Sequence, residues 1–263
     1  MLWLKTLLGI TVQAFLLGIF VYLPAWTWYW EDAITWFSIF YFMSFFSCIY
    51  LLIYKPESLE ARLNVQPSSQ PREDKIATSL MITAIAIGLI FSPLDAFHFQ
   101  VTPSFEGILK ISGLGIYVIG YLFILASMLA NEFAEMTVNI QDDRGQKVID
   151  TGVYAYVRHP MYTGFIFFIL GTNLWLGTYL SFGISVIALT IGLYFRIRIE
   201  EKTLLYELDG YQDYLKEHIP GASFLDLQIQ ISDPESQYKF TLPDICLLYT
   251  SPSPRDATLS RMP

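Results

Sequence analysis

Residues 152–164 read GVYAYVRHPMYTG, and residues 194–220 read YFRIRIEEKTLLYELDGYQDYLKEHIP. Between them lies a long apolar stretch that divides into segments at 161–178 and 181–199. A short turn between two membrane-length helices returns the chain to the surface that it left, so the two polar clusters would meet at one face of the membrane. We therefore expect a helical hairpin with a polar site at its open end.

The composition indicates a membrane protein. Hydrophobic residues make up 54% of the 263 residues, charged residues only 15%, and the mean hydropathy is +0.44. Such a chain has too little polar material to cover a globule, and we expect an all-α, polytopic membrane helical bundle. The net charge of -8 argues against nucleic acid as a partner. The two cysteines, Cys48 and Cys246, provide neither a disulfide framework nor the spacing of a metal site.

Six apolar segments are long enough to be candidate transmembrane helices. They fall near 2–23, 33–54, 76–94, 108–130, 161–178 and 181–199. The connections at 24–32 and 95–107 contain no Lys or Arg, whereas those at 55–75 and 131–160 contain several. By the positive-inside rule this alternation predicts a multi-pass protein with both termini in the cytoplasm.

The chain divides into four parts. Residues 1–130 hold the first four predicted membrane helices, and residues 131–220 hold the two polar clusters with the last two helices. The first residues of the 55–75 connection resemble a short helix, and residues 131–151 are a candidate lid. Residues 221–245 are polar and acidic, as in a cytoplasmic tail. Residues 246–263 resemble translated sequencing-adapter read-through, and we expect them to have no part in the fold.

The first cluster lies at the predicted start of the fifth membrane helix. Pro160 suits a first helical position, where its missing N–H is not needed. Backbone N–H groups at a helix N-terminus, together with Arg158, attract an anionic ligand group. His159 and Tyr162 are three residues apart and share a face of the helix. The alternative is an ordinary interfacial anchor, because aromatic and basic residues gather at membrane surfaces.

The second cluster lies at the end of the sixth membrane helix. Arg196 and Glu200 are four residues apart and share a face, whereas Arg198 projects elsewhere. Arg196 would hold a carboxylate, and Glu200 would bind a cationic or hydroxyl-bearing ligand group. The alternative is an Arg and a Glu that neutralise each other at the membrane boundary. Because Glu201 adds a second acid beyond that pair, the pattern favours a ligand site.

Taken together, TGVYAYVRHPMYTG at 151–164, RIRIEEKTLL at 196–205 and YQDYLKEHIP at 211–220 resemble the isoprenylcysteine carboxyl methyltransferase family. That family is similar in this region to phospholipid N-methyltransferases. The resemblance covers about residues 131–220, and the first four helices match only in being membrane helices. It implies an S-adenosylmethionine cofactor entering from the cytoplasm and a lipophilic or lipidated substrate arriving through the bilayer.

The resemblance also implies roles for individual residues. Glu200 matches the cofactor-binding acid, and Arg196 matches the arginine that holds the substrate carboxylate. The positions that match cofactor-contacting residues are Gln146, Lys147, Val148, Ile149, Tyr154, His159, Pro160, Met161 and Tyr162. The sequence departs from the family pattern between the Glu pair and Tyr211, where it is one residue shorter; Arg196 and Glu200 lie before this difference.

The methyl acceptor stays open between a carboxylate, such as that of an isoprenylcysteine, and a lipid amine. A carboxylate is already a nucleophile and needs only to be positioned, whereas an amine must lose a proton, for which Glu200 or Glu201 is the candidate base. Two other classes are the alternatives: a membrane sterol-reductase-like enzyme that uses NADPH, and a non-catalytic membrane scaffold. The His-Pro-x-Tyr and Glu-Glu arrangement favours the methyltransferase.

Overall fold

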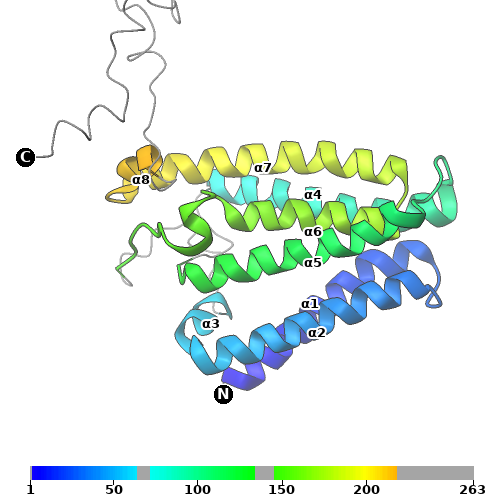
Figure 1. Ribbon diagram of the computed structural model, residues 1–263, viewed down its shortest axis with the longest axis horizontal. Helices are drawn as coiled ribbons and strands as arrows, with labels where there is room; N and C mark the ends of the chain where they lie inside the picture. Colours follow the sequence, from blue (N-terminus) through cyan, green and yellow to red (C-terminus); the bar gives the residue numbers. More distant parts are fainter. Residues whose placement is uncertain (1, 64–71, 134–144, 218–263) are drawn as a thin grey trace, which may run out of the picture.

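The computed structural model describes residues 2–63, 72–133 and 145–217, which form a bundle of helices (Figure 1). The α-helices are α1 (Leu2–Ala25), α2 (Glu31–Tyr54), α3 (Pro56–Leu63), α4 (Arg72–Leu94), α5 (Gly107–Ala130), α6 (Pro160–Leu176), α7 (Tyr179–Glu207) and α8 (Tyr211–Glu217). Two short helical turns, η2 (Asp95–Phe99) and η4 (Gly152–Ala155), lie in the connections. The predicted lid falls largely outside these ranges, as do both predicted tail segments.

Each of the six predicted apolar segments coincides with a helix. Within the described residues, five helices are long and apolar enough to cross a membrane: α1, α2, the continuous Arg72–Phe99 stretch, α5 and α7. This confirms the all-α membrane bundle expected from the composition. The sixth helix, α6, has 17 residues, or roughly 26 Å at 1.5 Å per residue, against a hydrocarbon core of roughly 30 Å. That α6 crosses the whole bilayer stays a prediction.

The two helices of the C-terminal hairpin pack mainly against other helices. Consecutive helices α6 and α7 are joined by a short turn, but α6 lies chiefly along α5 and α7 chiefly along α4 (Figure 1). α1 packs on α2 and on α4, which places the N-terminal pair beside the same bundle. The hairpin is therefore set in place from both sides, by α5 on one and by α4 on the other.

Glycines allow α5 and α6 to approach closely. A Cβ atom on Gly120 of α5 would lie 2.3 Å from the backbone nitrogen of Phe168, and one on Gly171 of α6 would lie 2.3 Å from that of Tyr117. Small residues at such contacts let two membrane helices pack backbone to backbone, where dispersion and not the hydrophobic effect drives association. The α5–α6 pair is thus a rigid support for the start of α6.

A buried polar cluster fixes the turn between α6 and α7. Thr178 caps α7 through a capping box with Ser181, and the Thr178 hydroxyl donates a hydrogen bond of 2.5 Å to Asp95. Asp95 also accepts hydrogen bonds from the Thr102 hydroxyl at 3.1 Å and the Val101 N–H at 3.0 Å. A buried carboxylate with several donors is satisfied without a cation. The cluster sets the register of α7 relative to α4 and α6.

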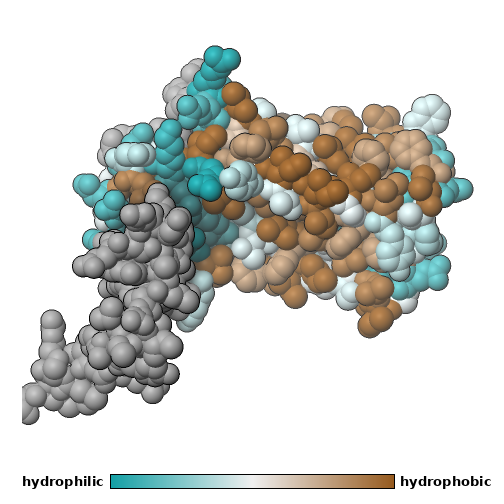
Figure 2. Space-filling model, turned by 90° about the horizontal axis from the view of Figure 1, so that it is seen from above, coloured by the Kyte–Doolittle hydropathy of each residue, from teal (hydrophilic) through white to brown (hydrophobic). Residues whose placement is uncertain are grey.

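The surface of the bundle suits a bilayer. Large apolar side chains such as Leu8, Phe15 and Phe46 point outward with most of their surface exposed. Figure 2 shows apolar residues gathered over the middle of the bundle and polar residues toward its ends. A water-soluble protein rarely exposes so large an apolar surface, whereas lipid covers it in a membrane.

The short helix α3 is the one expected at the start of the 55–75 connection. Its Arg62 donates hydrogen bonds to the backbone carbonyls of Met128 at 3.2 Å and Asn131 at 3.0 Å. These carbonyls lie at the C-terminal end of α5, where helical carbonyls lack partners within the helix. α3 therefore closes the same end of the bundle that carries η4 and α8 (Figure 1).

Candidate active site

The two polar clusters lie together at one end of the bundle. Pro160 is the first residue of α6 and is buried, so the chain enters the helix directly after His159. α7 continues as a single helix through the second cluster to Glu207. Because the two helices are antiparallel neighbours across the Thr178 turn, the start of α6 lies beside the last turns of α7 (Figure 1).

Glu201 joins the first cluster to the second. Its Oε1 atom accepts a hydrogen bond of 2.8 Å from Nη1 of Arg158 and lies 3.1 Å from Nε2 of His159. Nδ1 of the same His159 ring lies 4.0 Å from Oε1 of Glu200. The imidazole is thus placed between two carboxylates. Both carboxylates are about a quarter exposed, at 26% for Glu200 and 25% for Glu201, and so lie within reach of a ligand.

Tyr162 connects this cluster to Arg196. Its hydroxyl donates a hydrogen bond to Oε2 of Glu200 and accepts one of 2.9 Å from Nε of Arg196. The Tyr162 ring stacks on that of His159, with centroids 5.6 Å apart and planes inclined by 20°. The spacing of Arg196 and Glu200 by one helical turn therefore brings both to the same tyrosine. Hydrogen-bonded side chains that polarise one another in this way hold each other in one geometry.

Arg196 is held from the other side by α4. The residue is 1% exposed, and its Nη1 atom pairs with Oδ1 of Asp74 and donates a hydrogen bond of 2.8 Å to the Thr78 hydroxyl. Asp74 is itself 2% exposed. This partner is not predictable from the sequence pattern, because Asp74 stands in a charged connection 122 residues before Arg196. The neighbouring Arg198, by contrast, is exposed and lies over the Tyr194 ring at 5.4 Å.

A group of tyrosines packs around the start of α6. The Tyr214 hydroxyl of α8 donates a hydrogen bond of 2.8 Å to the backbone carbonyl of Tyr154 in η4. Burial raises the pKa of Tyr154 to about 12, and the negative charge of Glu200 acts in the same direction. Burial likewise raises the pKa of Tyr211, with a further contribution from Glu201. These tyrosines are neutral at physiological pH and serve as hydrogen-bonding groups.

The upstream strip predicted to contact a cofactor lies close by. Residues 146–150 have no regular secondary structure, and Gly152 begins η4 with φ at +61°, a conformation that favours glycine. Val148 lies near Gly210, in the turn between α7 and α8, where an added Cβ would be 3.9 Å from it. Within the described ranges, no hydrogen bond or ion pair joins Lys147 or Ile149 to the network around Tyr162.

The predicted site residues therefore fall into two groups. One network of contacts joins His159, Tyr162, Arg196 and Glu200. Tyr154 lies close enough to Glu200 for the carboxylate to raise the pKa of the tyrosine. Pro160 and Met161 form the first turn of α6, and Gln146, Lys147, Val148 and Ile149 lie in the segment before η4.

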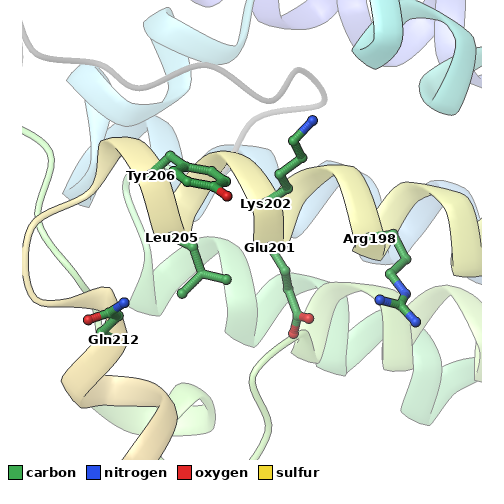
Figure 3. A pocket seen from close by; sticks show the side chains of 6 residues that line it. All are labelled: Arg198, Glu201, Lys202, Leu205, Tyr206 and Gln212. Atoms are coloured by element: carbon green, nitrogen blue, oxygen red, sulfur yellow. The ribbon is translucent and has the colours of Figure 1, made fainter.

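An open groove lies on the outer side of Glu201. Its cavity volume is about 400 Å³, and Figure 3 shows it between α7 and α8. The lining residues are Arg198, Glu201, Lys202, Leu205, Tyr206 and Gln212. Glu201 thus belongs both to this groove and to the network, whereas Arg196 and Tyr162 lie behind it in the bundle.

Comparison with known proteins gives matches over this part of the chain. A sequence model of the phospholipid methyltransferase family matches residues 108–207, which run from the start of α5 to the end of α7. The chain is 32% identical over 118 residues to the protein-S-isoprenylcysteine O-methyltransferase of Schizosaccharomyces pombe, a match that covers 43% of this chain and 49% of that relative. It is 32% identical over 122 residues to the enzyme of that name from Homo sapiens, covering 44% of this chain and 42% of the relative.

A third relative of the same name, from Saccharomyces cerevisiae, is 38% identical over 68 residues, covering 26% of this chain and 28% of its own length. The chain therefore spans about half or less of the length of these curated relatives. No solved structure matches it. The family match contains His159, Tyr162, Arg196, Glu200 and Glu201. The resemblance seen in the two polar clusters is thus confirmed: the segment from α5 to α7 matches the phospholipid methyltransferase family and is similar to the isoprenylcysteine O-methyltransferases.

Proposed function

We propose that this chain is an S-adenosylmethionine-dependent integral membrane methyltransferase that acts on a lipophilic acceptor. The observation that carries the proposal is the network at the ends of α6 and α7, in which two carboxylates, an imidazole, a tyrosine and a guanidinium converge. The relatives are named for methyl transfer to an isoprenylcysteine. Five membrane-length helices in the described residues supply the setting for such a substrate.

The side chains present fit this cofactor. When bound, S-adenosylmethionine supplies a methyl group on a positively charged sulfur, together with an amino group and a carboxylate. The partly exposed carboxylates of Glu200 and Glu201 suit the cationic amino group. Arg158 and the N-terminus of α6 suit an anionic group. Tyr154, His159, Pro160, Met161 and Tyr162 surround that end of α6, and Gln146, Lys147, Val148 and Ile149 precede it.

The chain's contribution to methyl transfer is orientation and electrostatics. Displacement at the methyl carbon is in line, so the acceptor atom must lie behind the methyl group with water excluded. Arg196 and Glu200 hold the tyrosine between them and so fix the inner wall of the site. Arg196 then positions a carboxylate acceptor, whose oxygen attacks without losing a proton. An amine acceptor has to give up a proton, and Glu200 or Glu201 takes it.

The test uses native membranes that contain the full chain. Incubation with methyl-labelled S-adenosylmethionine, followed by solvent extraction, is expected to give a labelled lipophilic product. Base treatment then separates the two acceptor classes, because a methyl ester releases its label as methanol and an N-methyl group keeps it. Membranes from cells without the chain are the control. Label incorporation equal to that control would contradict the proposal.

A further inference from the structure

The acid that pairs with Arg196 lies outside the segment that matches the family. The match begins at residue 108, whereas the acid paired with Arg196 lies in α4, at Asp74. Both side chains are almost fully buried, at 1% and 2% exposure. Two charges buried in this way must be paired, because an isolated ion in an apolar interior has lost its hydration without compensation.

The contacts of Arg196 give it a fixed direction. Nη1 points at Asp74 and Thr78 on α4, while Nε points at the Tyr162 hydroxyl on α6. Because a guanidinium is planar, fixing Nη1 and Nε orients the whole group. The Thr78 hydroxyl also lies 3.5 Å from Oδ1 of Asp74, so α4 presents both partners together. The Tyr162 hydroxyl, which accepts from Arg196, also donates a hydrogen bond to Glu200 and so connects the position of the guanidinium to that of the carboxylate.

We infer that Asp74 is a positioning residue of the proposed methyl-transfer site, which orients Arg196 from α4 and so makes the N-terminal half of the bundle part of that site. The inference rests on the proposed function. Asp74 lies at the opposite end of the network from Glu201, which keeps its own contacts with Arg158 and His159. Loss of Asp74 is therefore expected to impair the acceptor side of the site more than the cofactor side.

Asp95 offers a matched control in the same membrane-spanning stretch. It is fully buried like Asp74, but its partners are the neutral groups of Thr178, Thr102 and Val101, at the opposite end of the bundle. Asp95→Asn therefore perturbs a buried carboxylate without touching Arg196. If Asp74 only supported the fold, Asp74→Asn and Asp95→Asn would both lower the amount of folded protein and leave the rate per folded molecule unchanged.

The experiment measures methyl transfer in membranes with labelled S-adenosylmethionine, normalised to folded protein by gel filtration in detergent. Asp74→Asn is expected to lower the rate at saturating S-adenosylmethionine by tenfold or more, with less than a threefold change in the KM for S-adenosylmethionine. Asp74→Glu, which keeps the charge, is expected to recover at least a third of the wild-type rate. Asp95→Asn is expected to keep the wild-type rate per folded molecule.

Thr78→Val keeps the test decisive even where Asp74→Asn does not fold, because it removes a neutral partner of Arg196 and leaves the ion pair in place. It is expected to lower the rate at least threefold. If the wild type is active and both Thr78→Val and folded Asp74→Asn keep its rate, the inference is wrong. The proposed function is not affected by that result. An inactive wild type would instead overturn the proposed function.

Discussion

The Tyr162 hydroxyl lies between a buried cation and a partly exposed carboxylate, and it satisfies both. It accepts from Nε of Arg196 at 2.9 Å and donates to Glu200. A hydrogen bond to a charged group contributes about 1.5–3 kcal/mol, and a buried group left without its partner costs more than the bond itself gains. The tyrosine is therefore the residue through which the orientation of Arg196 reaches the acid proposed to bind the cofactor.

Tyr162→Phe is expected to keep the ring stacking with His159 and to lose both hydrogen bonds. We expect the rate of methyl transfer to fall by about 10–100-fold, which corresponds to about 1.4–2.8 kcal/mol. The matched control is Tyr206→Phe, at an 82% exposed tyrosine of the open groove, which should change the rate by less than about twofold. Equal rates in the two variants would show that the Tyr162 hydroxyl has no part in the reaction.

Tyr154 is expected to make the stability of the folded protein fall at alkaline pH. Burial raises the pKa of Tyr154 to about 12 in the folded protein, whereas an exposed tyrosine titrates near 10. Between pH 10 and 12 the unfolded chain releases this proton and the folded protein retains it, so stability is complete below pH 10 and falls as pH rises toward 12. Thermal unfolding in detergent is expected to show a smaller drop from pH 9 to pH 11 in Tyr154→Phe than in the wild type. An equal drop in both proteins would place the alkaline sensitivity elsewhere.

At the scale of helices, the site depends on the close packing of α5 and α6. Gly120 of α5 meets the backbone of α6 at Phe168, whereas a Cβ on Gly115 of the same helix would meet nothing within 4 Å. Gly120→Ala is therefore expected to lower the free energy of unfolding by about 1–3 kcal/mol through overpacking. Gly115→Ala is expected to be neutral or slightly stabilising, because alanine favours a helix over glycine by about 1 kcal/mol. Denaturant titration in micelles measures both, and equal stabilities would rule out the close contact.

The sequence predicts the helices and the half of the site that depends on spacing within a helix. Arg196 and Glu200 are four apart in α7, and helical geometry alone puts them on one face. His159 lies just before α6 with non-helical φ and ψ, and its ring stacks on that of Tyr162. The glycine contacts were not predicted, although Gly113 and Gly120 on α5 and Gly164 and Gly171 on α6 repeat at seven residues. That repeat predicts a face of small residues on each helix, but it does not say which helix packs against that face.

Asp74 is the part of the site that no local pattern could predict. In the sequence it belongs to a charged connection with acids and bases on either side, which is typical of a solvated surface. Its burial results from the packing of α4 along α7, a contact between segments far apart in the chain. The predicted apolar segment ends at residue 199, whereas α7 continues through the second cluster to Glu207.

At the scale of the whole molecule, the polar end of the bundle holds α3, η4, α8 and the candidate site (Figure 1). The distribution of Lys and Arg predicts that this end faces the cytoplasm. Glu106, just before α5, and Lys202, in the last turns of α7, are both exposed and are predicted to lie on opposite sides of the membrane. In a background with Cys48→Ser and Cys246→Ser, we expect a membrane-impermeant maleimide to label Glu106→Cys in intact cells. Lys202→Cys should require permeabilisation, and the reverse pattern would invert the topology.

The central claim is that the His159 corner and the Glu200 turn bind one cofactor-sized molecule, and calorimetry on the purified full chain in detergent tests it most directly. We expect S-adenosylhomocysteine to bind the wild type, His159→Ala and Glu200→Ala each to weaken that binding by tenfold or more, and NADPH not to compete. Absence of S-adenosylhomocysteine binding, or its displacement by NADPH, would contradict the account.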